Sequence, residues 1–508
     1  MSLDPRTPVV VGVGQAAERI DDAYYRAMSG VELAAAAARA ALEDCGADAA
    51  KVAATIDTVA GVRQFEISGP AEPVLGKSNN YPRSVANRIG ADPARAILEV
   101  VGGQGPQHLI TELAGQIAAG QSEVALIFGS DATSTTRYFA GADNRPDFSE
   151  TVAGPLEDRG HGLERLVSRY TVSHGLTSAP IQYALLENAR RAGTGLGPTE
   201  YLQRMGELFA PMSKVAVDNP FAAAPVERSV DELITVTESN RMIAEPYPRL
   251  LVARDQVNQG AAALVMSVEA ARRLGVPEEN WVYLHGHADM EEQQLLVRPD
   301  LGHSPAAVLA VREALATAGI GIDDIATFDL YSCFPVPVFN ICDGIGIATD
   351  DPRGLTLTGG LPFFGGAGNN YSMHAVAETV ARTRSAPGQF GMVGANGGIL
   401  SKYSVGIYST TPIQWKPGRC AELQVQVASW PTESVSEVAD GTATIETYTV
   451  RRDSGKLTGI IIGRLADGSR FVSTTEDDEL IALLTDDEPL GHSVQVRSFD
   501  YGNRCTLV

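Results

Sequence analysis

The run Tyr331-Ser332-Cys333-Phe334 places a phenol hydroxyl and a thiol two residues apart. A cysteine attacks a thioester as its thiolate, and a positioned thiol also serves as an acid or a base. The Tyr331 hydroxyl can donate a hydrogen bond. A free cysteine is also often a small buried apolar residue. The sequence leaves both roles open for Cys333.

Two glycine-rich loops are the other segments that could hold a ligand. The first is Gly102-Gly103-Gln104-Gly105, directly before Pro106, and the second is Gly365-Gly366-Ala367-Gly368-Asn369-Asn370. Such a loop can cradle an anion at a helix N-terminus, or it can simply permit a tight turn. Neither loop has the Lys-Ser/Thr pair of a phosphate-binding loop. We expect tight turns, with anion binding as a second use. The candidate ligand-binding residues are Gly103, Gln104, Gly365, Gly366, Asn369 and Asn396.

Strands and helices alternate around these segments. Residues 9–14, 56–62, 96–101 and 124–128 are short apolar runs typical of buried strands. Residues 32–45 and 106–119 are predicted helices, each ending before a glycine. The alternation predicts an α/β fold with a parallel sheet covered on both faces.

A weak internal repeat indicates that this pattern occurs twice. Residues 39–46 resemble residues 312–319, and an apolar strand follows each segment. Two similar halves would bring strand ends and helix N-termini to a shared interface, where ligands bind in such sheets.

Two further regions depart from the repeat. Residues 131–249 predict a long, partly helical insertion, and residues 412–508 predict a separate β-rich domain, perhaps a barrel. The expected domains are therefore 1–270 with the insertion, 271–411 and 412–508. Small barrels often bind nucleic acid, but this one has 15 acidic against 9 basic residues. We expect a packing or partner-binding role instead.

The net charge limits which kinds of molecule the chain can bind, and the cysteine content indicates the cellular compartment in which it works. A net charge of −22 disfavours nucleic acid and anionic membranes, so an anionic ligand needs a local positive site. The five cysteines are scattered without the spacing of a zinc site or a disulfide framework. We see no signal peptide and no apolar run long enough to span a bilayer, and expect a cytoplasmic protein without a metal.

These motifs resemble the thiolase superfamily, close to the sterol-carrier-protein-2-thiolase branch and the thiolase-like type 1 group. The resemblance covers residues 8–411, and the β-rich domain resembles the extra C-terminal module of that group. It implies a fold of two βαβαβαββ halves with an inserted loop domain. It rests on the turn at residues 99–106, the helix end at 116–120, the Tyr331–Phe334 run, Gly359-Gly360 and Asn396-Gly397-Gly398.

The resemblance also implies where catalytic groups should stand. The family's nucleophilic cysteine falls at Gly103, its catalytic histidine at Gly366 and its second cysteine at Ala395. The third family motif retains Cys333 and replaces its oxyanion-water holder by Tyr331. His374 follows on the next predicted helix, where we expect it to pack or cap. Members usually dimerise near the third strand of the first half, which is altered here, so the oligomeric state is open.

Three functions remain as hypotheses. The chain binds CoA or an acyl-CoA in lipid metabolism without the thiolase nucleophile and histidine, since losing one member of a catalytic set already removes most of the rate. Alternatively it is an altered acyltransferase, of the acetyl-CoA acetyltransferase kind, that uses Cys333 and Tyr331. The third hypothesis is a non-catalytic scaffold that recruits a protein partner through the C-terminal β-domain.

Overall fold

The computed structural model describes residues 3–163, 166–453 and 455–508. Its main body is a ten-stranded sheet with the order β10-β11-β12-β9-β1-β8-β4-β2-β3-β5. β1 and β9 pair antiparallel, Val10 against Val282, and so join the two halves. The strands are β1 (Pro8–Ala17), β2 (Thr58–Gly61), β3 (Arg95–Leu98), β4 (Val124–Asp131), β5 (Glu157–Asp158), β8 (Gln259–Ser267), β9 (Val282–Glu291), β10 (Ile325–Leu330), β11 (Phe390–Gly397) and β12 (Lys402–Ser409).

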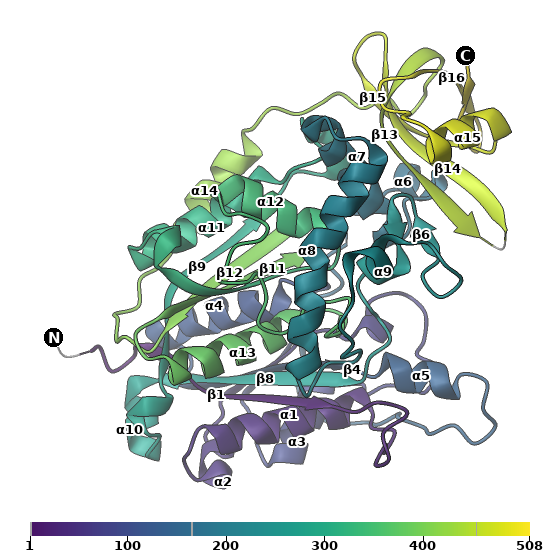
Figure 1. Ribbon diagram of the computed structural model, residues 1–508. Helices are drawn as coiled ribbons and strands as arrows, with labels where there is room; N and C mark the ends of the chain where they lie inside the picture. The colour runs from purple at the N-terminus through teal and green to yellow at the C-terminus, as the bar shows by residue number, and fades with distance from the viewer. Residues whose placement is uncertain (1–2, 164–165, 454) are drawn as a thin grey trace.

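The two halves of this sheet lie on either side of a central pair of helices (Figure 1). α4 (Gly105–Ala118) and α13 (Tyr371–Ser385) contact each other and strands of both halves. Other helices cover the outer faces, so helices and sheet halves alternate in layers. The outer helices are α1 (Gly30–Asp44), α2 (Ala49–Ala53), α3 (Tyr81–Ile89) and α10 (Val268–Leu274) on one side, and α11 (Pro305–Ala318), α12 (Pro335–Ile345) and α14 (Cys420–Ala428) on the other.

The two predicted helix–strand pairs occupy equivalent places in the halves. α1 precedes β2 and packs on β1 and β8, whereas α11 precedes β10 and packs on β9 and β12. α1 is Ala-rich and begins at Ser29, which forms a capping box with Glu32. These positions agree with two similar halves that face each other across α4 and α13.

The insertion between β4 and β8 is largely helical. It runs over one end of the sheet (Figure 1), and its longest helices pack against the C-terminal half and against the barrel described below. Its elements are α5 (Thr133–Phe139), α6 (Arg169–Ser173), α7 (Ala179–Thr194), α8 (Pro198–Asp218), α9 (Val230–Ile234), β6 (Met242–Ala244) and β7 (Tyr247–Pro248), together with the short β5.

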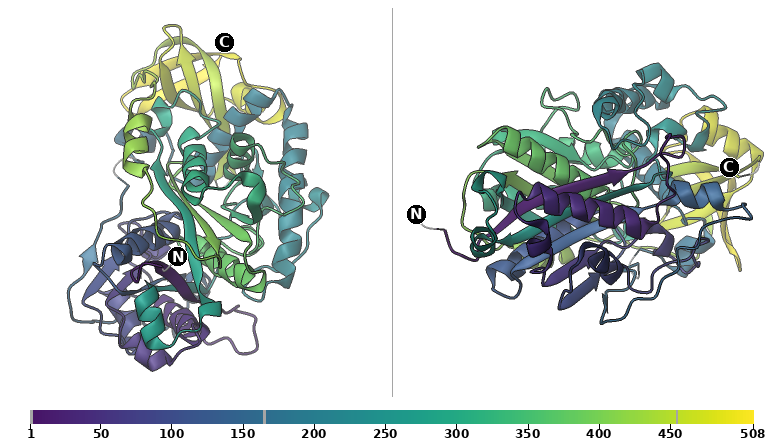
Figure 2. Two further views of the ribbon diagram at one scale, coloured as in Figure 1. Left: turned by 90° about the vertical axis from the view of Figure 1, so that its left-hand side faces the viewer. Right: turned by 90° about the horizontal axis from the view of Figure 1, so that it is seen from below.

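The C-terminal β-domain is a small closed barrel, as the sequence indicated. Its strands follow the order β14-β15-β17-β16-β13, and β13 pairs with β14 to close the ring. Apolar side chains fill its interior, among them Ile461, Phe471 and Val494. Figure 2 shows it on the side of the molecule away from the N-terminus. Its elements are β13 (Gly441–Asp453), β14 (Lys456–Leu465), β15 (Arg470–Thr475), α15 (Asp478–Asp486), β16 (Ser493–Phe499) and β17 (Gly502–Leu507).

The barrel is joined to the insertion. β6 pairs with β13 where Ala244 faces Arg451, and β7 follows at the edge. From α7, Asn188 donates a 2.9 Å hydrogen bond to the Tyr448 carbonyl oxygen. Among the described residues, the helices are each too short or too polar to cross a lipid bilayer.

Candidate functional site

The centre of the predicted site lies where the two central helices begin. Gly103 stands just before α4, and Ser372 in the first turn of α13 donates a 2.7 Å hydrogen bond to the Gly103 carbonyl oxygen. Asn369 accepts a 3.0 Å hydrogen bond from the Gly102 amide. Tyr331 and Cys333 follow β10, and Asn396 lies near the end of β11. The structure therefore brings together residues that are far apart in the sequence.

Tyr331 occupies the space next to Gly103. A Cβ atom at position 103 would lie 2.7 Å from the Asn396 carbonyl oxygen and still closer to the Tyr331 hydroxyl oxygen. Side-chain carbons do not approach other atoms this closely, so position 103 has no room for any side chain beyond hydrogen. Tyr331 is 7% exposed, and burial raises the pKa of its hydroxyl group.

Cys333 is enclosed among polar and aromatic groups. Its Sγ lies 3.8 Å from Asn396 Nδ2, which also donates a 2.7 Å hydrogen bond to the Tyr183 hydroxyl. The Tyr183 ring stacks on Phe334 at 4.5 Å. Burial raises the pKa of the Cys333 thiol to about 12, and its side chain is 7% exposed. Only about one thiol in 10⁵ is ionised at pH 7 with such a pKa.

Tyr183 is a member of this cluster that sequence reasoning missed. It comes from α7 in the insertion, and its hydroxyl donates a 2.8 Å hydrogen bond to the Gly398 carbonyl oxygen. Tyr183 is buried, and no local motif surrounds it. The only feature of the sequence that could have pointed to Tyr183 is its position on the buried face of a helix.

The second glycine loop packs against the segment that contains Ala253 and Arg254. The atoms nearest to a Cβ at Gly366 belong to Arg254, Leu361 and Ala253, at 3.3 Å or more. Gly365 has a φ of +118° and faces Val257 and Gln259. Position 366 therefore has more room than position 103, and its neighbour Ala253 donates a 2.9 Å hydrogen bond from its amide to the Cys333 carbonyl oxygen.

Gln104 and Asn369 are buried beside the first loop. The side-chain oxygen of Gln104 has no hydrogen-bond partner among the described residues. Asn369 Nδ2 donates hydrogen bonds to the Arg63 carbonyl oxygen at 2.8 Å and to Ser68 Oγ at 3.1 Å. Asn369 therefore ties the second loop to the first half of the chain.

His374 lies inside the molecule on α13. Its Nδ1 is 2.7 Å from Gln15 Oε1 on β1, which assigns the ring proton to Nδ1. Burial lowers the pKa of His374 to about 3. Its Nε2 has no partner among the described residues. The contact with β1 is that of the packing histidine we expected.

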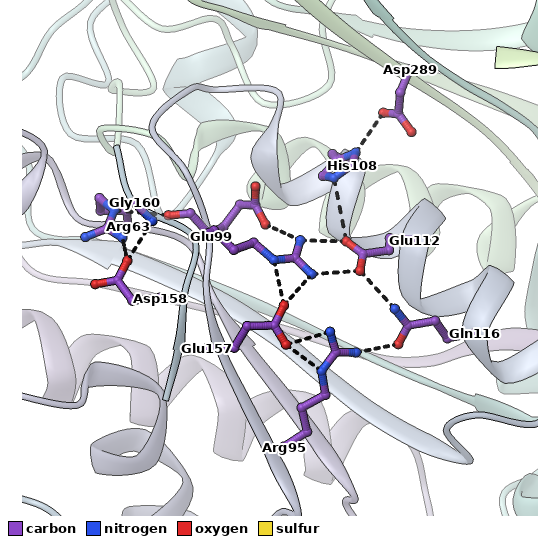
Figure 3. Close-up of polar contacts among 11 residues, drawn as sticks. Arg63, Arg95, Glu99, His108, Glu112, Gln116, Glu157, Asp158, Gly160 and Asp289 are labelled. Atoms are coloured by element: carbon purple, nitrogen blue, oxygen red, sulfur yellow. Dashed lines mark hydrogen bonds and ion pairs between the residues drawn. The ribbon is translucent and has the colours of Figure 1, made fainter. Parts of the chain in front are cut away.

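A network of charges connects Glu99, four residues before Gly103, to α4 and β5 (Figure 3). Arg159 binds Glu99 and Glu112, both at 2.7 Å, and Glu157 at 3.0 Å. His108 on α4 lies 3.4 Å from Asp289 on β9. Burial alone would lower the pKa of His108, but Asp289, Glu99 and Glu112 raise it to about 9.

Glu99, His108 and Glu112 also have the geometry of three metal ligands, with their ligand atoms within 4.8 Å of one another. The Arg159 guanidinium already lies against both carboxylates, and a protonated imidazole cannot bind a metal. The geometry is that of a salt-bridge network.

The network fixes β5 along the edge of β3. The two strands pair in parallel, Ile97 with Glu157 and Leu98 with Asp158. Arg95 at the start of β3 binds Glu157 at 2.7 Å, and Arg63 binds Asp158. β5 therefore covers the edge of the third strand in the first half.

Comparisons with known proteins agree with this architecture. A family model described as the thiolase-like protein type 1 additional C-terminal domain matches residues 422–500. No curated protein matches the chain. A crystal structure of a monomeric SCP2-thiolase-like protein type 1 from Mycobacterium smegmatis is 58% identical with a TM-score of 0.87, and the match covers 100% of both chains.

More distant structures share the main body. The Ltp2-ChsH2(DUF35) aldolase is 20% identical with a TM-score of 0.56, covering 80% of this chain and 98% of that one. The dimeric peroxisomal thiolase of Saccharomyces cerevisiae is 13% identical with a TM-score of 0.56 over the same shares. At such identities these two matches show the fold alone. The chain has the thiolase fold with an additional C-terminal barrel, and it belongs to the SCP2-thiolase-like protein type 1 family.

Proposed function

We propose that this chain binds CoA or an acyl-CoA, in acyl-CoA or lipid metabolism, without forming the acyl-enzyme of a thiolase. The main evidence that thiolase chemistry is lost is the position of the Tyr331 hydroxyl group, which fills the space beside Gly103. A thiolase cysteine at position 103 would have nowhere to place its side chain. The preserved fold supports a retained CoA site.

The missing groups would have worked as a set. The resemblance implies glycines at the nucleophile and histidine positions, Gly103 and Gly366, and Ala395 in place of a second cysteine. Catalytic groups that act together lose most of the rate when one of them is removed. With no thiolate at position 103, a thioester bound here keeps its acyl group.

Calorimetric titration of the full chain with CoA, acetyl-CoA and a long-chain acyl-CoA tests the proposal, with a thiolysis assay on the same sample. We expect binding with a Kd in the micromolar range and no turnover above the rate without protein. Turnover would refute the loss of thiolysis, and an absence of heat with all three compounds would refute CoA binding.

The altered acyltransferase is the second candidate, because Cys333 lies near Tyr331, Asn396 and Tyr183. The raised pKa of Cys333 and its burial count against a nucleophilic thiolate. If an acyl-transfer activity is found, Cys333→Ala should abolish it, whereas the distant buried Cys45→Ala should leave it unchanged. Equal activity in both variants would remove Cys333 from the mechanism.

We also infer that the chain is a monomer with its partner-binding surface on the barrel. β5 covers the edge of β3, where the family resemblance places the dimer contact. The relative from M. smegmatis is described as monomeric. A partner of the C-terminal β-domain would meet exposed apolar side chains there, such as Val438 and Tyr501. Light scattering during gel filtration tests the first part, and a dimeric mass would contradict it.

A reducing compartment such as the cytoplasm completes the proposal. All five cysteines are free, and Cys45, Cys333, Cys342 and Cys505 are buried. A chain with this cysteine usage gains nothing from an oxidising environment. Fractionation of the source cells would place the chain with cytoplasmic markers if this inference is right and with exported proteins if it is wrong.

A further inference from the structure

A hollow of about 530 Å³ lies on the outer face of the C-terminal barrel. It opens on the side where α6 lies next to β14 (Figure 1). The end of α6 and the segment that follows it form one wall, and strands β13, β14, β15 and β17 form the other. This volume is in the range of small-molecule sites. The lining residues are Val172, Ser173, Gly175 and Thr177 from the insertion, and Arg451, Asp453, Lys456, Thr458, Ile460, Thr474, Glu476 and Arg504 from the barrel.

Strand register places the barrel residues on one surface. Arg451 faces Thr458 across β13 and β14, and Thr474 faces both Ile460 on β14 and Arg504 on β17. Directly opposed residues share a face, and alternate residues along a strand share it too. The intervening Val450 and Ile461 point into the barrel core. The hollow is therefore a continuous outer face of four strands.

Positive charge gathers on this face, although the whole chain carries a net charge of −22. Three cations line the hollow against two carboxylates, Asp453 and Glu476, and Lys456 is paired with Glu476 at 2.7 Å. The Nε of Arg451 is buried and has no hydrogen-bond partner among the described residues. A buried donor without a partner costs free energy, so a ligand that accepts from it gains that energy back.

Arg504 stands beside an aromatic surface. Its guanidinium carbon lies 4.8 Å from the centre of the Tyr501 ring, and Tyr501 stacks on Phe499 at 5.3 Å. Both rings are exposed, Tyr501 by 60% and Phe499 by 44%. A ligand held by Arg504 would have a flat apolar surface next to its charged group.

We propose that this hollow binds a small organic phosphate, with its phosphate groups between Arg451 and Arg504 and its organic part toward Tyr501. Guanidinium groups recognise phosphate through paired hydrogen bonds. The hydroxyl group of Thr474 lines the same hollow and supplies a further donor. The size of the hollow and the net negative charge of the whole chain favour a single small ligand over a polymer.

Calorimetry on the full chain at low salt tests the proposal with inorganic pyrophosphate and adenosine diphosphate as probes. We expect one site for each probe, with the diphosphate ester bound more tightly because it also contacts the ring surface. Arg451→Ala and Arg504→Ala should each weaken binding at least about tenfold. The control Arg452→Ala, one residue along β13 and directed to the other face, should leave the Kd unchanged.

A variant that is expected to bind the probes more tightly distinguishes a specific effect on the site from a general loss of structure. Glu476→Gln removes the carboxylate that holds Lys456, so it should tighten the binding of both probes several-fold. The proposal is overturned if neither probe binds, or if binding is unchanged in Arg451→Ala and Arg504→Ala. Weaker binding of the diphosphate ester than of pyrophosphate would overturn the assignment to an organic phosphate.

Discussion

At the scale of single residues, Gly103 and Tyr331 form one unit. Gly103→Ala would press a methyl group into Tyr331 and the Asn396 carbonyl group, so we expect it to lower the free energy of unfolding by about 1–3 kcal/mol. In the double variant with Tyr331→Ala, the lost ring makes room for the methyl group. The double variant should therefore lose less than the two single variants together.

Urea denaturation of the four proteins in this cycle measures the coupling between the two positions. Gly366→Ala is the matched control, because its nearest neighbour lies 3.3 Å away and its cost should be smaller. Equal costs at positions 103 and 366, or strict additivity in the cycle, would show that Tyr331 does not fill the place of a missing side chain.

At the scale of elements, β5 holds its place on β3 through side chains, because a pairing of only two residues has little stability of its own. Arg159→Ala would leave Glu99, which is 2% exposed, and Glu112 without their shared cation. We expect a loss of about 1–3 kcal/mol and faster amide exchange at the β3–β5 pairing. The exposed pair of Arg273 and Glu123 gives a control, since Arg273→Ala should cost less than about 1 kcal/mol.

Hydrogen exchange of the backbone amide at position 159, which binds the Leu98 carbonyl oxygen, reports on this pairing directly, because alanine keeps the amide. Gel filtration at rising concentration supplies the second measurement, because an uncovered β3 edge is free to pair with another chain. An Arg159→Ala protein that keeps both its stability and its monomeric mass would show that the ion pairs do not hold β5.

The elements differ in how far the sequence predicted them. Regular apolar runs such as 124–128 identify a strand because its side chains are buried on both faces. β5 has two exposed residues, Glu157 and Asp158, and no such pattern. Tyr183 reaches Asn396 across 213 positions of the chain, a contact that no local period encodes. The sequence showed a glycine at position 103, but only the folded structure shows that Tyr331 fills the space beside it.

At the scale of the whole molecule, buried histidines set how stability depends on pH. Burial lowers the pKa of His374 to about 3 and also lowers those of His174, His285 and His287. The unfolded chain takes up protons below about pH 6.5, where the folded chain does not. Stability from these groups is therefore complete above about pH 6.5 and is lost as the pH falls toward the folded pKa values.

His108 acts in the opposite direction, because its pKa is raised to about 9. Its contribution is complete below about pH 6.5 and is lost as the pH rises through 9. From the histidines alone, stability should be greatest near pH 6.5. For His374, a shift from about 6.5 to about 3 corresponds to roughly 5 kcal/mol across that window.

Urea denaturation at a series of pH values from 7 to 4 measures these contributions in the intact chain. His374→Gln retains a side chain that can bond to Gln15 but cannot take up a proton. Its stability should fall less steeply with acid, by about 1.4 kcal/mol per pH unit below pH 6. The exposed His492→Gln should follow the parent chain. If His374→Gln and the parent lose stability in parallel, His374 is protonated in the folded state and its burial does not control acid unfolding.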